Sequence, residues 1–242
     1  MIPSRFNGPP DSGNGGYSCG LVARALGGGS AEVMLKAPPP LDRELRVERE
    51  DGSARVLDGE TVVAEGRRAD VDVTPPDLSI TLDQAATAEG GGPFVDPHAH
   101  PFPSCFVCGP LREQGDGLRI FAGPVESTSA DGKPVFAAAW TPPASVAGGD
   151  GALPEEVVWA ALDCPTSGPV ANDPERPGFL PIVLGRLAAR VDRPVIAGET
   201  HLVLSWEISI DGRKRDAAAA LYTAAGALCA VSRALWIELR ST

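Results

Sequence analysis

The sequence predicts an α+β protein made of two fused halves, each an antiparallel sheet wrapped around one central helix. Two observations lead to this prediction. Each half shows one early helical pattern followed by several strand patterns, and short clusters of Gly and Pro separate the strands. A chain of 242 residues has room for two small domains. We expect an N-terminal half over residues 1–85, a linker over 86–103 and a C-terminal half over 104–242.

The first half begins with a helical pattern over residues 14–28. Gly15 and Gly16 open the helix, and Gly27-Gly28-Gly29 end it because glycine readily leaves helical geometry. Extended segments separated by Pro-rich or Asp-Gly turns follow near residues 31–36, 44–50 and 61–73. The next stretch, residues 74–103, is rich in Pro, Gly and acidic side chains, so we expect a linker that packs on the surface.

A second series of elements begins at residue 117. Two strand patterns, 118–121 and 135–140, precede a helix that starts at Pro154 and runs to Pro165. Four longer strand patterns follow, over residues 182–191, 200–210, 213–223 and 227–239. A helix of this length needs a curved sheet to bury it. One sheet around one helix is the hotdog arrangement, and two copies in one chain form a pseudo-dimer.

Composition and charge exclude several classes of function. With 32 acidic against 21 basic residues the net charge is −11, which repels phosphate backbones and anionic membranes. No stretch approaches the ~18 apolar residues of a membrane span, and residues 1–8 carry no signal-peptide pattern. The five cysteines, an odd number at uneven spacing, do not suggest a secreted disulfide framework. We expect a soluble, cytoplasmic protein without nucleic-acid or membrane partners.

Three short motifs in the second half carry a family resemblance: Cys105-Phe106-Val107-Cys108-Gly109, Gly117-Leu118-Arg119-Ile120-Phe121 and Trp159-Ala160-Ala161-Leu162-Asp163. Together they resemble bacterial hotdog thioesterases, in which a Cys-Phe-x-Cys-Gly segment and a Gly-Leu strand precede the central helix and a Leu-Asp lies within it. The resemblance covers roughly residues 104–164. It implies a double hotdog fold of the acyl-CoA thioesterase type.

The same family carries a His-Gly-Gly at the helix start, and each half of this chain keeps only part of that pattern. Nine residues before Asp163, where the histidine would stand, the chain has Pro154. The segment Asn14-Gly15-Gly16 is similar to the helix start, with asparagine in place of histidine, but Ala23 stands nine residues later. Because hotdog sites form between two subunits, the resemblance implies one composite catalytic site of Asn14, Gly15, Gly16 and Asp163. The opposite combination should be inactive and consists of Ala23, Pro154, Glu155 and Glu156.

The chemistry of these residues suits a thioester. Unpaired backbone N–H groups and the dipole at a glycine-rich helix start favour the negative charge that develops on a carbonyl oxygen. Asp163 would activate water as a general base or attack directly, and Asn14 would orient the water or the carbonyl. Thr166 and Ser167 are secondary candidates for holding the water. Plainer interpretations stay open: a helix cap for residues 14–16 and a turn-forming role for Asp163.

The sequence therefore predicts an acyl-CoA or acyl-carrier thioesterase that needs no cofactor, with the CoA moiety entering as part of the substrate. The alternative is a non-catalytic protein that binds acyl thioesters or CoA, because the usual histidine is missing from both helix starts. A hotdog dehydratase or hydratase fits less well, since those enzymes pair a histidine with a carboxylate. Association of copies through sheet edges into a homo-oligomer stays open.

A cluster of histidines and cysteines has the residue types of a zinc site and consists of His98, His100, Cys105 and Cys108. The His-x-His spacing is short, however, and no second distant pair completes a zinc finger. Cysteines in the hotdog motif are often simply small buried apolar residues. We therefore predict no metal site, and these four residues are the candidates should one exist.

Overall fold

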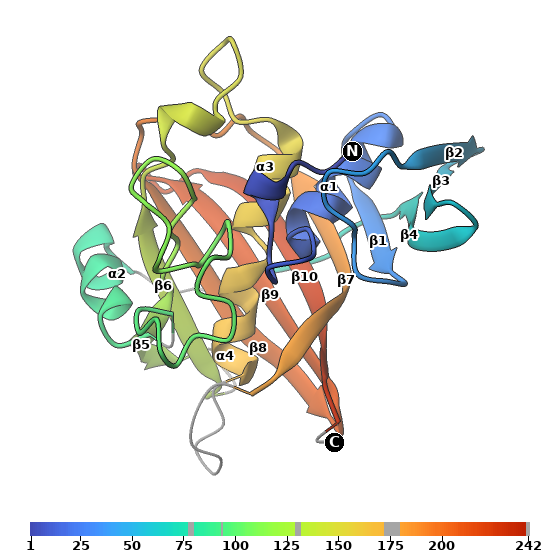
Figure 1. The fold of residues 1–242 in the computed structure, drawn as a ribbon. Coiled ribbons are helices and arrows are strands. Elements are labelled where there is room, and N and C mark those ends of the chain that lie inside the picture. Colours follow the sequence, from blue (N-terminus) through green and yellow to red (C-terminus); the bar gives the residue numbers. More distant parts are fainter. Residues whose placement is uncertain (77–79, 93, 129–131, 172–179, 241–242) are drawn as a thin grey trace.

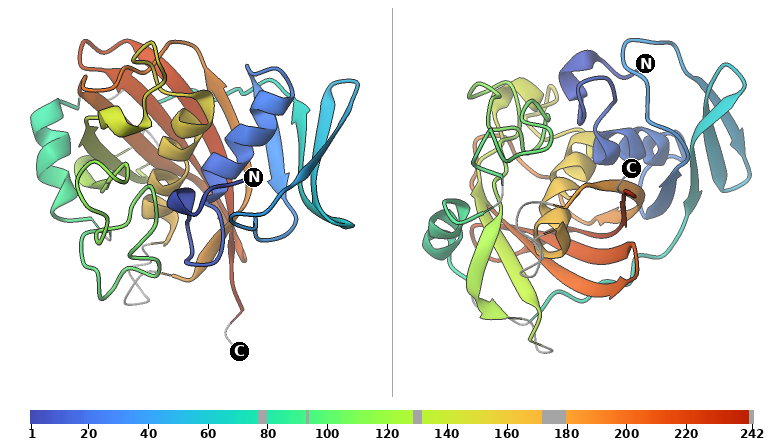
Figure 2. Two further views of the ribbon diagram at one scale, coloured as in Figure 1. Left: turned by 45° about the horizontal axis from the view of Figure 1, so that its top comes forward. Right: turned by 60° about the horizontal axis from the view of Figure 1, so that its bottom comes forward.

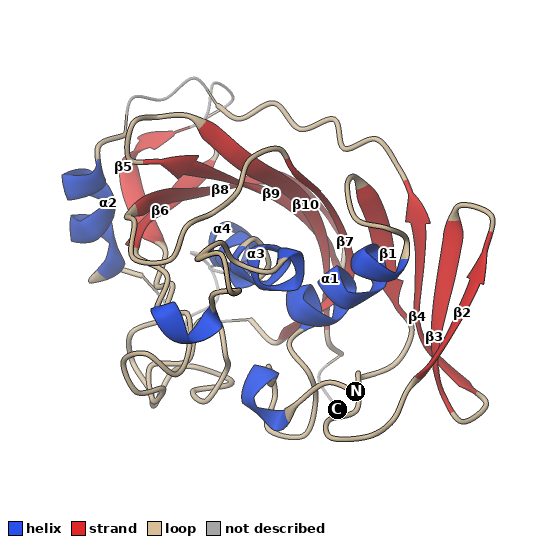
Figure 3. Cartoon of the chain, turned by 90° about the horizontal axis from the view of Figure 1, so that it is seen from above, coloured by secondary structure: helices blue, strands red, loops and turns tan. Residues whose placement is uncertain are grey.

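The computed structural model of the chain describes residues 1–76, 80–92, 94–128, 132–171 and 180–240. Within these residues ten strands form one sheet, in the order β2-β3-β4-β1-β7-β10-β9-β8-β6-β5 (Figure 1). Two helices, α1 (Gly15–Ala25) and α3 (Glu155–Ala161), lie next to each other inside the curve of this sheet (Figure 3). The predicted α+β class is confirmed, and the two predicted sheets, one around each helix, are joined into one.

The two halves share one connectivity. In the first half α1 leads into β1 (Ala31–Leu35), and the meander of β2 (Arg46–Glu50), β3 (Ser53–Asp58) and β4 (Thr61–Arg68) returns so that β4 pairs with β1. In the second half α3 leads, through a short α4 (Gly168–Ala171), toward β7 (Ile182–Val191). The meander of β8 (His201–Asp211), β9 (Lys214–Thr223) and β10 (Leu228–Glu238) then returns so that β10 pairs with β7.

The halves differ in what precedes the helix. In the second half β5 (Gly123–Thr128) and β6 (Pro134–Trp140) come first, and β6 extends the sheet by pairing with β8. Residues 1–14 contain no such strand, only a 3-10 turn (Ser4–Phe6) and an isolated bridge between Asn7 and Gly13. The first half is therefore a shortened copy of the second.

The two equivalent strands β1 and β7 join the halves into one sheet. They pair antiparallel, with Ala31 opposite Ala189 and Val33 opposite Leu187. All four side chains are buried, so the junction is part of the core and not a hinge between separate domains. Figure 2 shows the result, with β2, β3 and β4 projecting at one end of the molecule.

Glycines bring α1 and α3 into close contact. A Cβ atom at Gly20 would collide with the backbone of Glu156, and one at Gly16 would collide with the Cβ of Asp163 and the carbonyl of Trp159. Only glycine lets two helix backbones approach this closely. The contact buries Trp159 completely. It also brings the first turn of α1 next to the residue that follows α3.

Several sequence expectations on secondary structure were wrong. Residues 118–121 do not form a strand, because Arg119 adopts a left-handed backbone with φ of 52°. Strand β3 was not expected, although turns flank it on both sides. The expected linker contains a helix, α2 (Leu82–Glu89), which begins at a capping box between Thr81 and Gln84.

Helix α2 lies on the outer side of the sheet, against β5 and β6 (Figure 1). Its Ala85 is fully buried against Ala137 and Leu204. The Glu89 carboxylate at its last turn accepts a hydrogen bond from the Ala139 N–H. None of the helices in the described ranges is long and apolar enough to cross a lipid bilayer.

Candidate active site

The first turn of α1 is fixed by Asn14, which is almost completely buried. Its side-chain Oδ1 accepts a hydrogen bond from the Tyr17 N–H at 2.9 Å, which makes Asn14 the N-cap of the helix. Its Nδ2 points the other way and donates to Oδ2 of Asp163 at 3.1 Å. The Asn14 side chain therefore both caps the helix and holds the carboxylate. The sequence had offered the cap and the site role as alternative interpretations.

The turn after α3 fixes Asp163. The backbone carbonyl of Asp163 accepts hydrogen bonds from both the N–H and the hydroxyl of Thr166, at 2.9 and 2.6 Å. The Thr166 hydroxyl in turn accepts from Nε1 of Trp236, at 2.8 Å. Thr166 is fully buried and is not among the residues that line the cavity described below, so its contacts with Asp163 give it a positioning role. The expectation that Thr166 or Ser167 holds the water stays a prediction.

The Asp163 carboxylate has two unequal oxygens. Oδ2 accepts hydrogen bonds from the Gly16 N–H at 2.8 Å and from Asn14 Nδ2 at 3.1 Å. Oδ1 is buried, and no hydrogen-bond partner for it is found among the described residues. Burial raises the pKa of Asp163 to about 7, against the opposing effect of its two donors. The carboxyl group is therefore held in place through Oδ2, while Oδ1 keeps its hydrogen-bonding capacity unused among the described residues.

These residues form one wall of a cavity of about 570 Å³. This volume lies within the range typical of small-molecule sites. Most of the remaining wall is apolar and comes from β1, β7, β10 and the loop before β5; it includes Leu35, Phe94, Phe102, Ile182, Leu184 and Trp236. The site thus combines a buried carboxylate and a helix N-terminus with a largely apolar wall.

Gly15 supplies a backbone donor at the cavity wall. It is the first residue of α1, so its N–H has no partner within the helix, and none is found elsewhere among the described residues. Gly15 itself lines the cavity. The neighbouring Gly16 N–H is already taken by Asp163. At the positive end of α1, the Gly15 amide is therefore a donor that a ligand oxygen could use.

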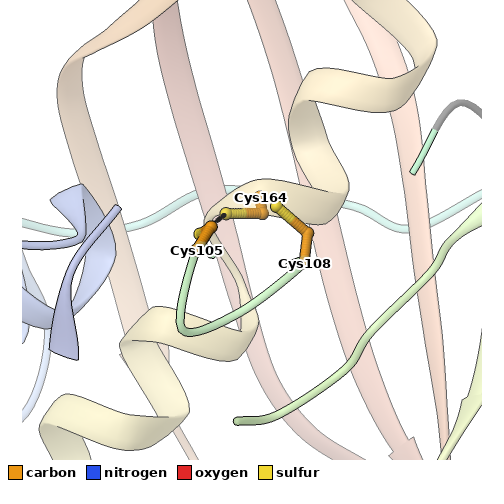
Figure 4. A group of neighbouring side chains, drawn as sticks. All are labelled: Cys105, Cys108 and Cys164. Atoms are coloured by element: carbon orange, nitrogen blue, oxygen red, sulfur yellow. Dashed lines mark hydrogen bonds between the residues drawn. The ribbon is translucent and has the colours of Figure 1, made fainter. Parts of the chain in front are cut away.

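Three cysteines stand beside this carboxylate. The sulfur atoms of Cys105, Cys108 and Cys164 all lie within 4.8 Å of one another, and all three residues line the cavity (Figure 4). Cys105 Sγ and Cys164 Sγ are 3.8 Å apart. Hydrogen bonds from Cys108 and Cys164 lower the pKa of the Cys105 thiol, whereas hydrogen bonding to Cys105 raises the pKa values of the other two.

The four metal-ligand candidates from the sequence do not form one group in the structure. Cys105 and Cys108 do, but their third neighbour is Cys164, which the sequence did not single out. His98 is exposed. His100 is buried at the cavity wall, where its Nδ1 accepts the Phe102 N–H at 3.0 Å. That bond places the His100 proton on Nε2, which has no hydrogen-bond partner among the described residues.

Comparisons with known proteins bear on the fold. No protein-family model matches the sequence, and no curated protein matches it significantly. Solved structures do match over nearly the whole chain. One is a conserved protein with a hot dog fold from Alicyclobacillus acidocaldarius, at 14% identity and a TM-score of 0.60, covering 100% of this chain and 92% of that one.

The chain has the hotdog fold.

Two further matches are described as thioesterases. The tesB protein of Mycobacterium avium subs paratuberculosis has 11% identity and a TM-score of 0.58, covering 96% of this chain and 89% of that one. The acyl-CoA thioesterase II TesB2 of Mycobacterium marinum has 12% identity and a TM-score of 0.55, covering 94% and 91%. At these identities the likeness establishes the arrangement of the chain and not its chemistry.

The start of α1 faces the carboxylate of Asp163, whereas the start of α3 has no equivalent carboxylate opposite it. Glu156, in the first turn of α3, is buried and forms an ion pair with Arg24 at 2.5 Å. Ala23, the residue at the position equivalent to Asp163, is fully buried and has no polar side-chain atom. The structure therefore brings the predicted residues together around Asp163, and it places no carboxylate at the equivalent point opposite α3.

Some residues of this site carried no signal in the sequence. Trp236 lies on the last strand, 70 residues from the Thr166 hydroxyl that its indole contacts. Cys164 directly follows Asp163 and reaches Cys105 only because α3 ends beside the Cys105–Cys108 loop. Such contacts depend on how the sheet closes around the helices, which no local pattern specifies.

Proposed function

We propose that this hotdog protein hydrolyses acyl thioesters, carried by CoA or by an acyl-carrier protein, at one composite site. The site consists of Asn14, Gly15 and Gly16 from the first half and Asp163 from the second. The observation that carries the proposal is the buried Asp163 carboxylate, bonded to the start of α1 at the wall of a largely apolar cavity. The fold shared with thioesterases supports it as an analogy only.

The cavity suits an acyl chain. Its apolar wall would bury the hydrocarbon against side chains such as Leu184 and Trp236. The thioester carbonyl would then lie at the start of α1, where the Gly15 N–H and the helix dipole stabilise an oxygen that becomes negative. Glycine at this position lets the substrate approach the backbone directly.

Asp163 would act on a water molecule. Its Oδ1 takes a proton while the water oxygen bonds to the carbonyl carbon, giving a tetrahedral intermediate. The C–S bond then breaks, and the leaving thiolate takes the proton back from Asp163. The products are a carboxylic acid and a thiol. Asn14 and the Gly16 N–H hold the carboxylate through Oδ2, which would leave Oδ1 for the proton transfer.

A non-catalytic function is the second candidate, and one observation favours it. The Gly16 N–H, which would otherwise stabilise the substrate oxygen, is already bonded to Asp163. This leaves a single helix-start donor, from Gly15, and asparagine stands where the family has histidine. A chain of this kind would bind an acyl thioester or CoA in the same cavity without hydrolysing it.

The test is thiol release from a panel of acyl-CoA substrates of increasing chain length, measured on the full chain. Asp163→Asn should lower kcat/KM by about 10²- to 10⁴-fold, as expected for loss of a general base. Asp83→Asn, on the exposed surface of α2, is the matched control and should keep wild-type activity. Asparagine preserves the shape of the side chain, so circular dichroism and thermal melting should show an intact fold.

Each outcome separates the candidates. Hydrolysis by wild type that Asp163→Asn abolishes supports the thioesterase. Absence of turnover together with a raised Tm in the presence of an acyl-CoA supports the binding protein. Hydrolysis by Asp163→Asn at the wild-type rate excludes the composite site proposed here.

A further inference from the structure

The three cysteines beside Asp163 form a group that the proposed hydrolysis does not use. Cys105 and Cys108 come from the loop before β5, and Cys164 comes from the turn after α3 (Figure 4). All three are free thiols and are buried. Three thiols from two distant segments therefore lie together at one part of the cavity wall.

The Cys105–Cys108 segment is a tight turn. The Gly109 N–H donates to the Cys105 carbonyl at 2.9 Å, and a Cβ atom at Gly109 would collide with the Cys105 backbone. The intervening Phe106 is fully buried and contacts the ring of Phe6 edge-on, with ring centroids 4.9 Å apart. The turn is therefore anchored, and its two sulfurs are held on the side that faces Cys164.

The spacing of the sulfurs matches a metal ion. Zn²⁺ binds thiolates at about 2.3 Å in tetrahedral geometry, so two sulfurs on one ion lie about 3.8 Å apart. The Cys105 and Cys164 sulfurs are 3.8 Å apart, and the third sulfur lies within 4.8 Å of both. One sulfur–sulfur distance thus equals the value expected on one ion, and the other two lie within about 1 Å of it.

One hydrogen-bond donor near the group would support bound thiolates at Cys105 and Cys164. Asn14 Nδ2 lies 3.6 Å from Cys164 Sγ and 4.0 Å from Cys105 Sγ, so its second N–H is directed at sulfur. Metal-bound side chains usually receive such support from a second layer of hydrogen bonds. No fourth His, Cys, Asp or Glu donor among the described residues joins the group. The fourth position on the metal would therefore be filled from the cavity, by water or by a ligand.

We propose that Cys105, Cys108 and Cys164 bind one thiophilic metal ion of the zinc type, with an open coordination position toward the cavity. The sequence argued against a metal because no second ligand pair follows Cys108. Cys164 supplies the missing ligand in space. The ion would tie the Cys105–Cys108 loop to the turn that carries Asp163. This site stands independently of the proposed hydrolysis, because no part of its geometry requires a thioester.

Cobalt is the probe that reports thiolate ligands directly. The full chain is reduced, freed of metal by a chelator and titrated with Co²⁺ under anaerobic conditions. We expect one equivalent to give thiolate-to-cobalt charge-transfer absorption and the intense visible bands of a tetrahedral ion, and we expect Zn²⁺ to displace it. The metal content of the protein as purified, measured by mass spectrometry, should be one zinc per chain.

Substitutions assign the ligands. Cys105→Ser, Cys108→Ser and Cys164→Ser should each weaken metal binding by about 100-fold or more, since even support residues around a metal are worth 10- to 100-fold. Cys229→Ser is the matched control, because Cys229 is equally buried but lies outside the group, and it should leave binding unchanged. Thermal melting of each reduced, metal-free variant shows whether it folds.

Two results would overturn the proposal. One is the absence of cobalt–thiolate absorption in wild type whose thiols are shown to be reduced. The other is a disulfide between Cys105 and Cys164 in the protein as purified, found by mass spectrometry, combined with no metal binding after reduction. If the cysteine variants do not fold, the wild-type titration alone decides, because the charge-transfer bands arise only from metal–sulfur bonds.

Discussion

Oδ2 of Asp163 accepts the Gly16 N–H at 2.8 Å, across 147 residues of sequence. The bond joins the two halves beside the cavity, whose wall Asp163 helps to form. It exists because α1 and α3 touch through glycines, with no side chain between them. The position of the carboxylate is thus set by the contact between the two backbones together with the Asn14 side chain.

A methyl group at Gly16 should separate these elements. Gly16→Ala would drive a Cβ into Asp163 and into the carbonyl of Trp159, so we expect a loss of about 1–3 kcal/mol of stability in urea unfolding. Thioester hydrolysis should also be lost. Gly15→Ala is the comparison: its Cβ would meet the mobile end of Leu184 at 2.8 Å, so the cost in stability should be smaller. Equal costs for the two variants would contradict this account.

Asn14 combines a cap with a contact to Asp163, and two substitutions separate these roles. Asn14→Ser keeps a good N-cap but loses the donor to Oδ2, whereas Asn14→Ala loses both. We expect both variants to lower kcat/KM by about ten-fold or more, and the alanine variant to lose a further ~1 kcal/mol of stability. If the serine variant is fully active, the Asn14–Asp163 hydrogen bond has no part in the reaction.

The protein's preference for acyl chains of a given length should depend on Leu184, whose side chain lies at the cavity wall beside Gly15. Leu184→Ala enlarges the cavity and should move the preferred substrate toward longer chains. Leu184→Trp should move it toward shorter ones. The measurement is kcat/KM across a series of straight-chain acyl-CoA substrates. Val47→Ala is the control, because Val47 is exposed on β2, and it should leave the preference unchanged.

Arg215 lies outside the candidate active site and should contribute to the free energy of unfolding. Its side chain is 5% exposed, forms an ion pair with Glu238 at 2.7 Å and donates to the Val170 carbonyl at 2.9 Å. Arg215→Leu leaves a partly buried carboxylate and a carbonyl without this donor, so we expect a loss of about 3 kcal/mol. Arg233→Leu breaks a more exposed pair with Asp216 and should cost under about 1 kcal/mol. Chemical unfolding of both variants, compared with wild type, gives the difference.

Much of the fold was predictable because its signals are local. The helix at Gly15, the long strands after residue 181 and the hairpin turn at Asp211-Gly212 all follow from apolar periodicity and turn residues. Helix α2 had a local signal too, since Thr81 and Gln84 form a capping box, but its Pro- and Gly-rich surroundings suggested a linker. The domain limits at residues 85 and 104 stay a prediction.

The site was predictable only where a family pattern reached it. Asn14 and Asp163 could be paired in advance because hotdog sites combine two subunits, and the structure places them 3.1 Å apart. The catalytic roles of both residues stay predictions. Cys164 and Trp236 could not be anticipated, because their contacts with Cys105 and Thr166 arise only when the sheet closes around the helices.

The pairing of β1 with β7 has a consequence for how this protein responds to dilution. Where two separate chains build a composite site, the site disappears as the chains dissociate at low concentration. Here both contributors belong to one chain, so the site forms in every folded molecule whatever its abundance. In a dimer of identical chains one mutation changes both helix starts. In this single chain the two halves can differ, so a substitution near Asn14 leaves the counterpart near Pro154 unchanged. One half can keep the helix start and the other the carboxylate.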